Sequence, residues 1–438
     1  MKAAVIGAGL AGVEAAWQLQ KRGVAVELYE MKPHKRSPAH RADGFAELVC
    51  SNSLKAERVN SAAGLLKAEM AEFSSVCVEA AYQTRVPAGG ALAVDRERFS
   101  AYITEKIEGC AGITVIHKEV TELPTDADVV IVAAGPLASD ALAETIRRLT
   151  GEAGLSFYDA AAPIVTAESI DFSEAFTQSR YDRGGADDYV NCPMDKAQYE
   201  AFYEAITSAE RAETHSFDER RDVYEGCMPI EALASRGRDT MRYGPLKPVG
   251  LVDPKTGHRP WANLQLRKEN NAGTMYNLVG FQTNLKFGEQ KRVFSMIPAL
   301  KNAQFVRYGV MHRNTFLDSP RLLSADFSLR ADPHIFFAGQ ITGVEGYMES
   351  ASSGILAGIN AARRLEEKEP LILPATTMMG ALSRYISDGS VKDFQPMGAN
   401  FGVLPPLDEK IRDKAARYQA LADRALAALD AYKEETGE

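Results

Sequence analysis

The chain has 438 residues, of which 45% are hydrophobic and 25% charged, and its formal net charge is −9. This length allows two domains, because single cores stop growing at about 250–300 residues. No run of about 18 apolar residues occurs, which excludes a membrane-spanning helix. The first core strand begins beside Met1, so we expect no cleaved leader and a cytoplasmic location. The negative charge argues against a nucleic-acid partner without excluding one, since phosphate binding needs only a local basic surface.

Residues 1–30 predict a dinucleotide-binding βαβ unit. A short apolar run at 2–6 leads into Gly7-Ala8-Gly9-Leu10-Ala11-Gly12 and then into a helix-forming stretch. In this pattern the first glycine permits a tight turn, the second lets the backbone approach a pyrophosphate, and the third allows close packing of helix on strand. The free N–H groups at the helix start then face the phosphates.

A second strand follows at residues 24–29 and ends at Glu30. An acid at this distance from the glycines can accept the ribose hydroxyls of a dinucleotide. A glycine-rich turn without a ligand is the alternative, but strand, glycines, helix, strand and acid in this order favour a bound dinucleotide. No second GxGxxG stands in such a context, so a nicotinamide donor, if used, is expected to bind transiently.

Residues 61–136 continue the alternation of helices and strands. Apolar residues at helical spacing predict a helix at about 61–73. Asp95 is suited to the N-cap of a helix over 96–107. A buried strand then runs from Asp128 into Gly135-Pro136, and we expect it to return to the sheet beside the first strand.

The middle of the chain, about 158–305, loses this alternation and is richer in Asp, Arg, Tyr and Asn. We interpret it as an inserted mixed α/β domain. The pattern returns at 334–340, where a strand ends in Gly339-Gln340, followed by Gly343 and by a helix at about 351–365. This suits the second contact region of an FAD domain, because the helix N-terminus can face the flavin or its phosphates.

The predicted fold class is therefore α/β, with a Rossmann-like, glutathione-reductase-like FAD-binding domain and an inserted mixed α/β domain. The FAD-binding domain is expected to be discontinuous and to comprise residues 1–157 and 306–438, with residues 158–305 as the insertion. The tail at about 408–432 is expected to form an amphipathic helix that packs on the body of the protein.

The chain has five cysteines, an odd number, and none stands in CxxC spacing. This pattern predicts neither a zinc site nor a disulfide framework, and it excludes the redox-active pair of flavin disulfide reductases. Reduced thiols beside a flavin, without such a pair, indicate attack on carbon rather than on sulfur. Cys77 and Cys110 are interpreted as structural, and Cys192 is the less favoured of the remaining thiols.

Cys227 and Cys50 are the candidate reactive thiols. Pro229 suits the first position of a helix and Gly237 the position after its end, which places Cys227 beside a helix N-terminus, among arginines in the sequence. Both effects favour the thiolate, although a small buried core residue is an equally good interpretation. Cys50 lies in a polar turn after a short apolar run, and a core role is again the alternative.

Two basic clusters could bind phosphates. One contains His34, Lys35, Arg36, His40 and Arg41, and the other contains Arg236, Arg238 and Arg242. For either cluster alone, a solvated charged face is the alternative interpretation.

Several segments, in order along nearly the whole chain, carry a resemblance to a known family. They are GAGLAGVEAAW at 7–17, ELVCSNSL at 47–54, RVPAGGALAVDRERFS at 85–100, NCPMDK at 191–196, EGCMPIEALASRGRDTMRYGPLKPVGL at 225–251, GFQTNLKFGEQKRVFSMIPAL at 280–300 and FFAGQITGVEGYMESASSGILAGINAA at 336–362. Together they resemble the folate- and FAD-dependent tRNA (uracil-5-)-methyltransferases (TrmFO), relatives of the GidA tRNA-modifying flavoproteins.

The resemblance implies a GidA-like fold and methylation of uridine C5 at position 54, in the T loop of tRNA. The implied one-carbon donor is methylenetetrahydrofolate, the cofactor is FAD, and NADPH or NADH re-reduces the flavin. The implied partners are tRNA and folate, with no protein partner and no membrane.

The resemblance also implies roles for single residues. Cys227 would add to C6 of the uracil, and Cys50 would assist near the flavin. His312 matches a family residue that stacks on folate, although an isolated histidine is more often structural, and Tyr347 is a further substrate-side candidate. Arg236 and Arg238 would hold RNA phosphates. Gln340 departs from the acid that often ends the second FAD motif, which leaves its contact open.

Alternative functions remain at this stage. The same chemistry could act on a uridine of ribosomal RNA, or the protein could be a GidA-type enzyme acting on the wobble uridine. Against the latter, the chain lacks a long helical C-terminal domain after the predicted tail. A flavin-dependent oxidoreductase for a small molecule predicts no use for Cys227, and a flavin-containing RNA-binding protein predicts binding without methyl transfer.

Overall fold

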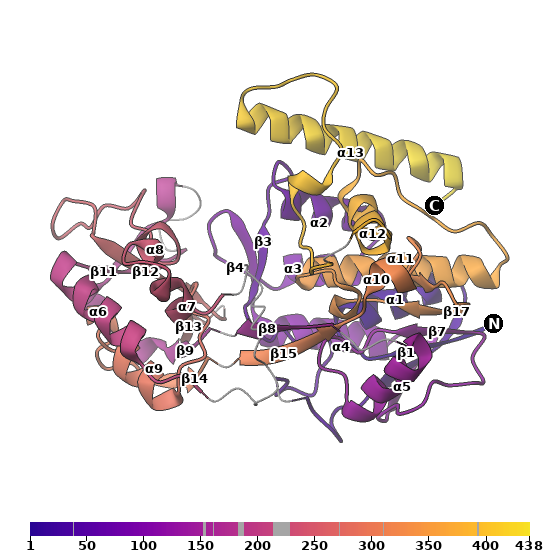
Figure 1. Cartoon of the computed structure of the whole chain (residues 1–438), viewed down its shortest axis with the longest axis horizontal. Helices are drawn as coiled ribbons and strands as arrows, with labels where there is room; N and C mark the ends of the chain where they lie inside the picture. Colours follow the sequence, from indigo (N-terminus) through magenta and orange to yellow (C-terminus); the bar gives the residue numbers. More distant parts are fainter. Residues whose placement is uncertain are drawn as a thin grey trace.

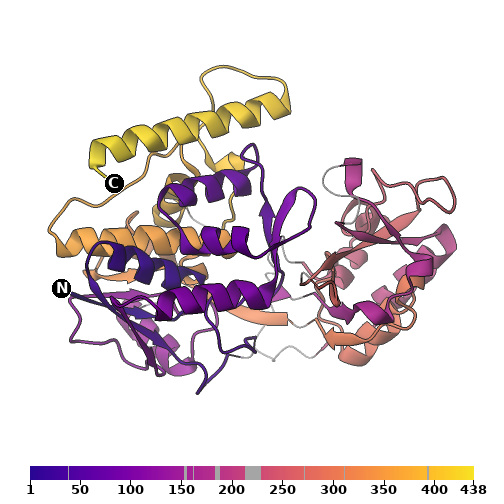
Figure 2. The same cartoon turned by 180° about the vertical axis from the view of Figure 1, so that it is seen from behind.

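The computed structural model of the protein describes residues 1–37, 39–151, 155–160, 162–182, 188–212, 228–270, 272–309, 311–391 and 394–438, without the side chains of 155–160, 182 and 311–315. The elements form two lobes, each with a sheet of its own (Figure 1). The larger lobe contains both ends of the chain, and middle segments form the smaller one, as the view from behind also shows (Figure 2).

The larger lobe is organised around a mostly parallel sheet with the strand order β16-β17-β7-β1-β2-β6. β1 pairs in parallel with β2 on one side and with β7 on the other, which confirms the place predicted for the strand after Asp128. Val5 and Ile131 in these strands have no exposed surface, as expected for a parallel sheet that is covered on both faces. The strands are β1 (Lys2–Ile6), β2 (Ala25–Glu30), β6 (Ile113–His117), β7 (Val129–Val132), β16 (Ser328–Leu329) and β17 (Asp332–Phe337).

Two long helices of this lobe, α1 (Leu10–Lys21) and α11 (Tyr347–Leu365), approach each other through glycines. A Cβ atom at Gly354 would lie 2.1 Å from the carbonyl oxygen of Ala11, and one at Gly358 would lie 2.6 Å from that of Ala15. No side chain larger than hydrogen fits at these positions, so the glycines determine how closely the two helices lie.

α11 begins at Tyr347, earlier than the start near residue 351 that the sequence predicts. Gly346 precedes it with a φ of 128°, a conformation that residues with a Cβ rarely adopt. The turn at this glycine lets the helix begin at once, and it places Tyr347 in the first turn of α11.

The remaining helices of the larger lobe start at polar N-caps. Ser61, Asp95 and Asp413 each accept a hydrogen bond from a backbone N–H in the first turn of their helix, and the predicted cap at Asp95 is confirmed. α13 lies across the outer side of this lobe (Figure 1). Over the described ranges, no helix is both long enough and apolar enough to cross a membrane. These helices are α2 (Ala62–Glu72), α3 (Val76–Gln83), α4 (Arg96–Glu108), α5 (Asp140–Thr150), α10 (Ser319–Leu322), α12 (Met378–Ser387) and α13 (Lys414–Thr436).

A short antiparallel sheet of the larger lobe stands between the lobes (Figure 1). Its central strand pairs with both neighbours, and the loop between two of its strands contains Gly89 and Gly90. The strands are β3 (Ser53–Ala56), β4 (Arg85–Val86) and β5 (Ala91–Val94).

The smaller lobe is built on an antiparallel sheet with the order β10-β11-β12-β13-β9-β14. Its core is separate from that of the larger lobe and includes Val165, Phe202, Leu264 and Phe294. The strands are β9 (Ile164–Thr166), β10 (Phe176–Thr177), β11 (Val190–Met194), β12 (Ala262–Lys268), β13 (Met275–Leu278) and β14 (Phe305–Arg307), and the helices are α6 (Lys196–Ser208), α7 (Ile230–Ser235), α8 (Thr240–Tyr243) and α9 (Phe287–Phe294).

Two paired strands, β8 (Leu155–Ala160) and β15 (Met311–Phe316), carry the chain out to the smaller lobe and back. The domain limits predicted from the sequence fall inside β8 and inside β14. We therefore propose the division into residues 1–157 with 306–438 and residues 158–305, which the two separate cores support.

Replacement of Gly354 with alanine is expected to destabilise the larger lobe. The added methyl group would overlap Ala11 in α1, and overpacking of this kind costs about 1–3 kcal/mol. Urea unfolding followed by circular dichroism measures the loss. Gly288→Ala in α9 is the matched control, because a Cβ there meets nothing within 4 Å. Equal midpoints for the two variants would contradict this account of the helix contact.

Candidate active site

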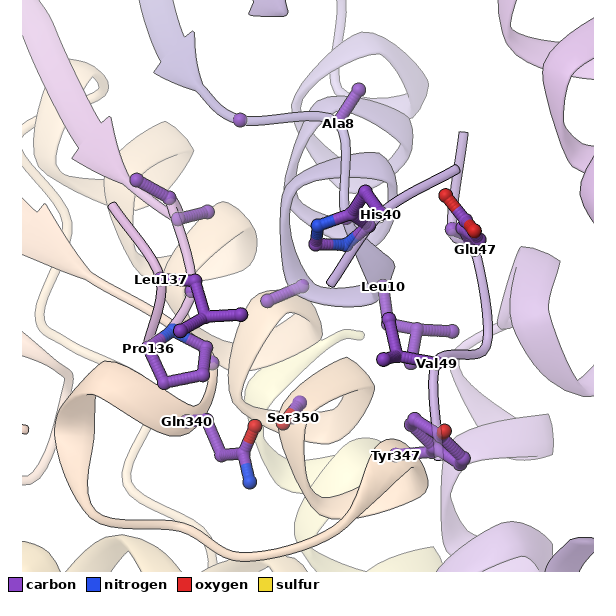
Figure 3. A pocket seen from close by; sticks show the side chains of 18 of the residues that line it. Ala8, Leu10, His40, Glu47, Val49, Pro136, Leu137, Gln340, Tyr347 and Ser350 are labelled. Carbon is purple, nitrogen blue, oxygen red and sulfur yellow. The ribbon is translucent and has the colours of Figure 1, made fainter. Parts of the chain in front are cut away.

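A cavity of about 520 Å³ lies at the carboxyl ends of the parallel strands. It is bordered by the glycine loop after β1, by the loops after β7 and β17, and by the start of α11. Figure 3 shows Leu10, Val49, Pro136 and Leu137 around this cavity, with Tyr347 at one side. Ligands of open α/β sheets bind at this edge, because the loops there are free to diverge.

The glycine loop has the geometry that a pyrophosphate requires. Gly7 has a φ of 99°, and a Cβ there would lie 2.6 Å from the carbonyl oxygen of Ala133. A Cβ at Gly12 would lie 1.7 Å from the carbonyl oxygen of Gly7, whereas a Cβ at Gly9 would meet nothing within 4 Å. Gly7 and Gly12 are therefore packed against other backbone atoms, whereas the space beside Gly9 is free for a ligand. No side chain caps α1, so its first N–H groups are available to a phosphate.

Glu30 holds the end of β2 against this loop. Its Oε2 atom accepts a hydrogen bond from the backbone N–H of Ala8 at 3.0 Å, and its Oε1 atom accepts one from the N–H of Lys32 at 2.9 Å. The side chain is buried and lines the cavity. This is the position of the acid that accepts ribose hydroxyls in dinucleotide-binding folds.

Cys50 and Tyr347 lie together at another part of the cavity wall. The Tyr347 hydroxyl oxygen accepts hydrogen bonds from the backbone N–H groups of Cys50, at 2.7 Å, and of Ser51, at 3.2 Å. The same oxygen is 3.0 Å from the Cys50 Sγ atom. Because two N–H groups occupy its acceptor sites, we expect the hydroxyl hydrogen to point at the sulfur. Burial raises the pKa of the Tyr347 phenol well above its usual range, which keeps that hydrogen in place.

Side chains from both lobes hold the segment around Cys50. Arg267 on β12 donates from Nε to the Asn52 side chain at 2.8 Å and from a terminal nitrogen to Ser51 Oγ at 2.9 Å. Arg96 donates to the carbonyl oxygen of Leu48 at 2.7 Å and pairs with Glu269 at 2.6 Å. The position of the thiol therefore depends on contacts between the two lobes.

Arg307, on β14, adds a partly buried positive charge near this thiol. Its Nε atom is buried and has no hydrogen-bond partner among the described residues. Burial lowers its pKa, and its charge interacts with Arg96, Tyr347 and Cys50. No sequence motif marks Arg307, Arg96 or Arg267 as site residues, because each approaches the site only through folding.

Only part of the second predicted cofactor region lines the cavity. Gly339 and Gln340 line the cavity, and Gln340 donates from Nε2 to Glu345 Oε2 at 2.7 Å. Gly343 is not one of the lining residues. It has a φ of 84°, and a Cβ atom at Gly343 would lie 2.4 Å from the ring of Phe394. Its glycine is required by that ring, whereas Gln340 uses its amide to hold a neighbouring carboxylate.

The other predicted site residues do not line the described cavity, or they lie outside the described residues. Arg236 is the C-cap of α7, and the exposed Arg238 lies 3.7 Å from Glu204. His312 is on β15, opposite Asp159, and its side chain is not described. Cys227 lies outside the described residues.

The three other cysteines differ in exposure. Cys77 and Cys192 are fully buried, and burial raises the pKa of both thiols. Cys110 is partly buried in contact with the core of the larger lobe. Within the described part of the chain, no cluster of His, Cys, Asp and Glu could hold a metal ion.

The fold and this cavity define a flavoprotein-type dinucleotide-binding protein with a Rossmann-like domain, which confirms the predicted fold class. The model of the family "Glucose inhibited division protein A" (GIDA) matches residues 2–369. The GidA structure from Aquifex aeolicus superposes with a TM-score of 0.71 at 17% identity, over 98% of this chain and 73% of that one.

Two relatives carry the name methylenetetrahydrofolate–tRNA-(uracil-5-)-methyltransferase TrmFO. The protein from Lactiplantibacillus plantarum is 56% identical over 99% of this chain and 97% of its own, and that from Acetivibrio thermocellus is 58% identical over 98% of each. The chain therefore belongs to the GidA family and, within it, to the TrmFO proteins, as the resemblance predicted.

Replacement of Glu30 with glutamine is expected to weaken FAD binding. The variant loses a charged acceptor that holds the Ala8 N–H and is suited to a ribose hydroxyl. A charged hydrogen bond of this kind contributes about 1.5–3 kcal/mol, or tenfold or more in the dissociation constant. Titration of the apoprotein with FAD, followed by flavin fluorescence, measures the change. Glu27→Gln on the same strand is the control, because Glu27 pairs with Lys2 instead. Equal affinity for both variants would refute the role of Glu30.

Replacement of Tyr347 with phenylalanine is expected to slow alkylation of Cys50. The sulfur loses its hydroxyl donor, which stabilises the thiolate by about 0.5–1.5 kcal/mol, so the rate should fall about 3–10-fold at a pH below the ordinary thiol pKa. Mass spectrometry of the Cys50 peptide after iodoacetamide treatment gives the rate. Tyr385→Phe is the control, because the Tyr385 hydroxyl donates to the carbonyl oxygen of Gln395. An unchanged rate in Tyr347→Phe would mean that the thiol is the donor.

Proposed function

We propose that this protein methylates C5 of uridine 54 in the T loop of tRNA, with methylenetetrahydrofolate as donor, FAD as cofactor and NAD(P)H as reductant. The observation that carries the proposal is the identity of 56% and 58% to TrmFO methyltransferases over almost the whole length of each chain. The cavity with its glycine loop and its adjacent thiol supports it. We also propose a cytoplasmic location, where reduced thiols persist.

The reaction needs a thiol because C5 of uracil is a poor nucleophile. A thiolate that adds to C6 makes C5 enolate-like, and C5 then attacks the one-carbon unit. Loss of the C5 proton afterwards expels the thiolate from C6 and restores the C5–C6 double bond. Cys227 is the proposed nucleophile, on the basis of its sequence context. α7 begins at Ile230 with Pro229 as its N-cap, two residues beyond the start of the described segment. Cys50 is proposed to assist, either by removal of the C5 proton or by protection of the site.

When bound, reduced FAD supplies the carrier for the one-carbon unit and the hydride equivalents that convert methylene to methyl. The residues of the chain would hold the FAD and orient the groups beside it. The glycine loop and Glu30 are suited to its pyrophosphate and ribose. Tyr347 directs its hydroxyl hydrogen at Cys50, and the charge of Arg307 favours the thiolate form of Cys50.

The substrates are proposed to enter between the two lobes. C6 of a stacked uridine is not accessible to a side chain, so the target base is expected to flip out of the T loop. Arg236 and Arg238 are proposed to hold RNA phosphates, which makes affinity depend on salt. His312 is proposed to stack on folate.

Replacement of Cys227 with alanine is expected to abolish transfer of label from methylenetetrahydrofolate to tRNA, because no thiolate then activates C5. Retention of FAD, seen as the yellow colour of the purified variant, shows that the fold survives. Cys110→Ser is the control and should keep full activity. Turnover in Cys227→Ala would exclude this thiol as nucleophile, and label at a nucleotide other than T-loop uridine, or in ribosomal RNA alone, would refute the substrate.

A further inference from the structure

A second cavity, of about 530 Å³, lies between the small antiparallel sheet of the larger lobe and the sheet of the smaller lobe. The larger lobe contributes Glu57, Arg58 and the Gly89-Gly90 turn. The smaller lobe contributes Arg180, Tyr181, Tyr189 and Gln265. None of these residues lines the first cavity.

The charges in this second cavity favour an anion. The exposed guanidinium of Arg58 makes no hydrogen bond or ion pair within the described ranges. Arg180 donates to Gln265 Oε1 at 2.8 Å and to the carbonyl oxygen of Val249 at 3.4 Å, and no described carboxylate pairs with it. The acid in the lining, Glu57, pairs with Arg85 at 3.0 Å. Two guanidinium groups without a carboxylate partner among the described side chains therefore face one space, in a chain whose net charge is −9.

The rest of the wall fits a nucleotide. Gly89 has a φ of 60°, and a Cβ at Gly90 would meet nothing within 4 Å, so a ligand can approach this turn closely. Tyr181 is 54% exposed, and its ring lies against Gly250, where a Cβ would be 3.0 Å away. An exposed aromatic ring beside arginines is the arrangement on which bases of single-stranded nucleic acid stack.

Strand β12 connects the second cavity with the segment around Cys50. Gln265 and Arg267 point to the same face of β12, because side chains alternate along a strand. Gln265 holds Arg180 in the second cavity, and Arg267 holds Ser51 and Asn52, next to Cys50. The same strand thus positions a reactive segment and an anion-binding group.

We propose that this second cavity is a subsite for a phosphate and base of the RNA substrate outside the target nucleotide. The inference rests on the proposed function, since it takes tRNA as the substrate. A nicotinamide dinucleotide offers the same phosphate chemistry, but no residue lines both cavities, and its hydride is needed in the first one. An RNA strand can instead extend along the surface from one cavity to the other.

The test measures tRNA binding and flavin reduction separately. Binding of a tRNA transcript to FAD-loaded protein is followed by fluorescence anisotropy at several salt concentrations. For Arg58→Glu we expect at least about tenfold weaker binding at low salt and a salt slope smaller by about one, as for the loss of one phosphate contact. Arg58→Lys should restore most of the affinity. The rate and KM of flavin reduction by NADPH without tRNA should stay at wild-type values.

A matched control and a second variant separate local from general effects. Arg412→Glu makes the same charge change at an exposed position ahead of α13, and it should bind tRNA as the wild type does. Tyr181→Ala should weaken binding, and Tyr181→Phe should not, because stacking needs only the ring.

The outcomes distinguish this subsite from the proposed function. Wild-type affinity and salt slope in Arg58→Glu overturn the subsite, as does an equal loss in Arg412→Glu. A raised KM for NADPH in Arg58→Glu with unchanged tRNA binding overturns the RNA assignment in favour of the reductant. A wild-type protein that neither binds nor methylates tRNA refutes the proposed function itself.

Discussion

The close contact between α1 and α11 is the constraint on which the rest of the site depends. α1 begins in the glycine loop, and α11 begins at Tyr347, so the two helix starts lie in the wall of one cavity. Gly354 and Gly358 let the helices approach until backbone meets backbone. A wider separation of the two helices would move the glycine loop away from Tyr347 and from Cys50, which Tyr347 contacts.

Contacts from both lobes position the thiol at this site. Cys50 belongs to a segment of the larger lobe, but Arg267 from the smaller lobe binds the residues that follow it, and Arg96 binds Glu269 across the same boundary. Buried charged hydrogen bonds of this kind are costly to break, because each leaves an unpaired charge behind. A movement of one lobe relative to the other would therefore displace the segment that carries the Cys50 sulfur. The inserted lobe thus helps to position this thiol.

Local patterns were sufficient for much of the fold and for part of the site. The glycine loop, Glu30 and the N-cap at Asp95 were predictable, because each is a short-range rule of backbone geometry or hydrogen bonding. Gly343 shows the limit of such rules. Its place after Gly339 and Gln340 suggested cofactor contact, yet its glycine is needed against Phe394, a residue far along the chain that no local pattern connects with it.

The sequence by itself determined the class of fold, the dinucleotide-binding loop and, through the family segments, the chemistry to which the thiols belong. These depend on residues that are neighbours in the chain. Only the tertiary structure decided that Tyr347 binds Cys50 and that Arg58 and Arg180 face one cavity. It also decided that the Nε atom of Arg307 is buried near the first pair, without a hydrogen-bond partner in the described part of the chain. The physical reason is that these pairs are joined by the packing of two lobes, which depends on the whole arrangement of both cores.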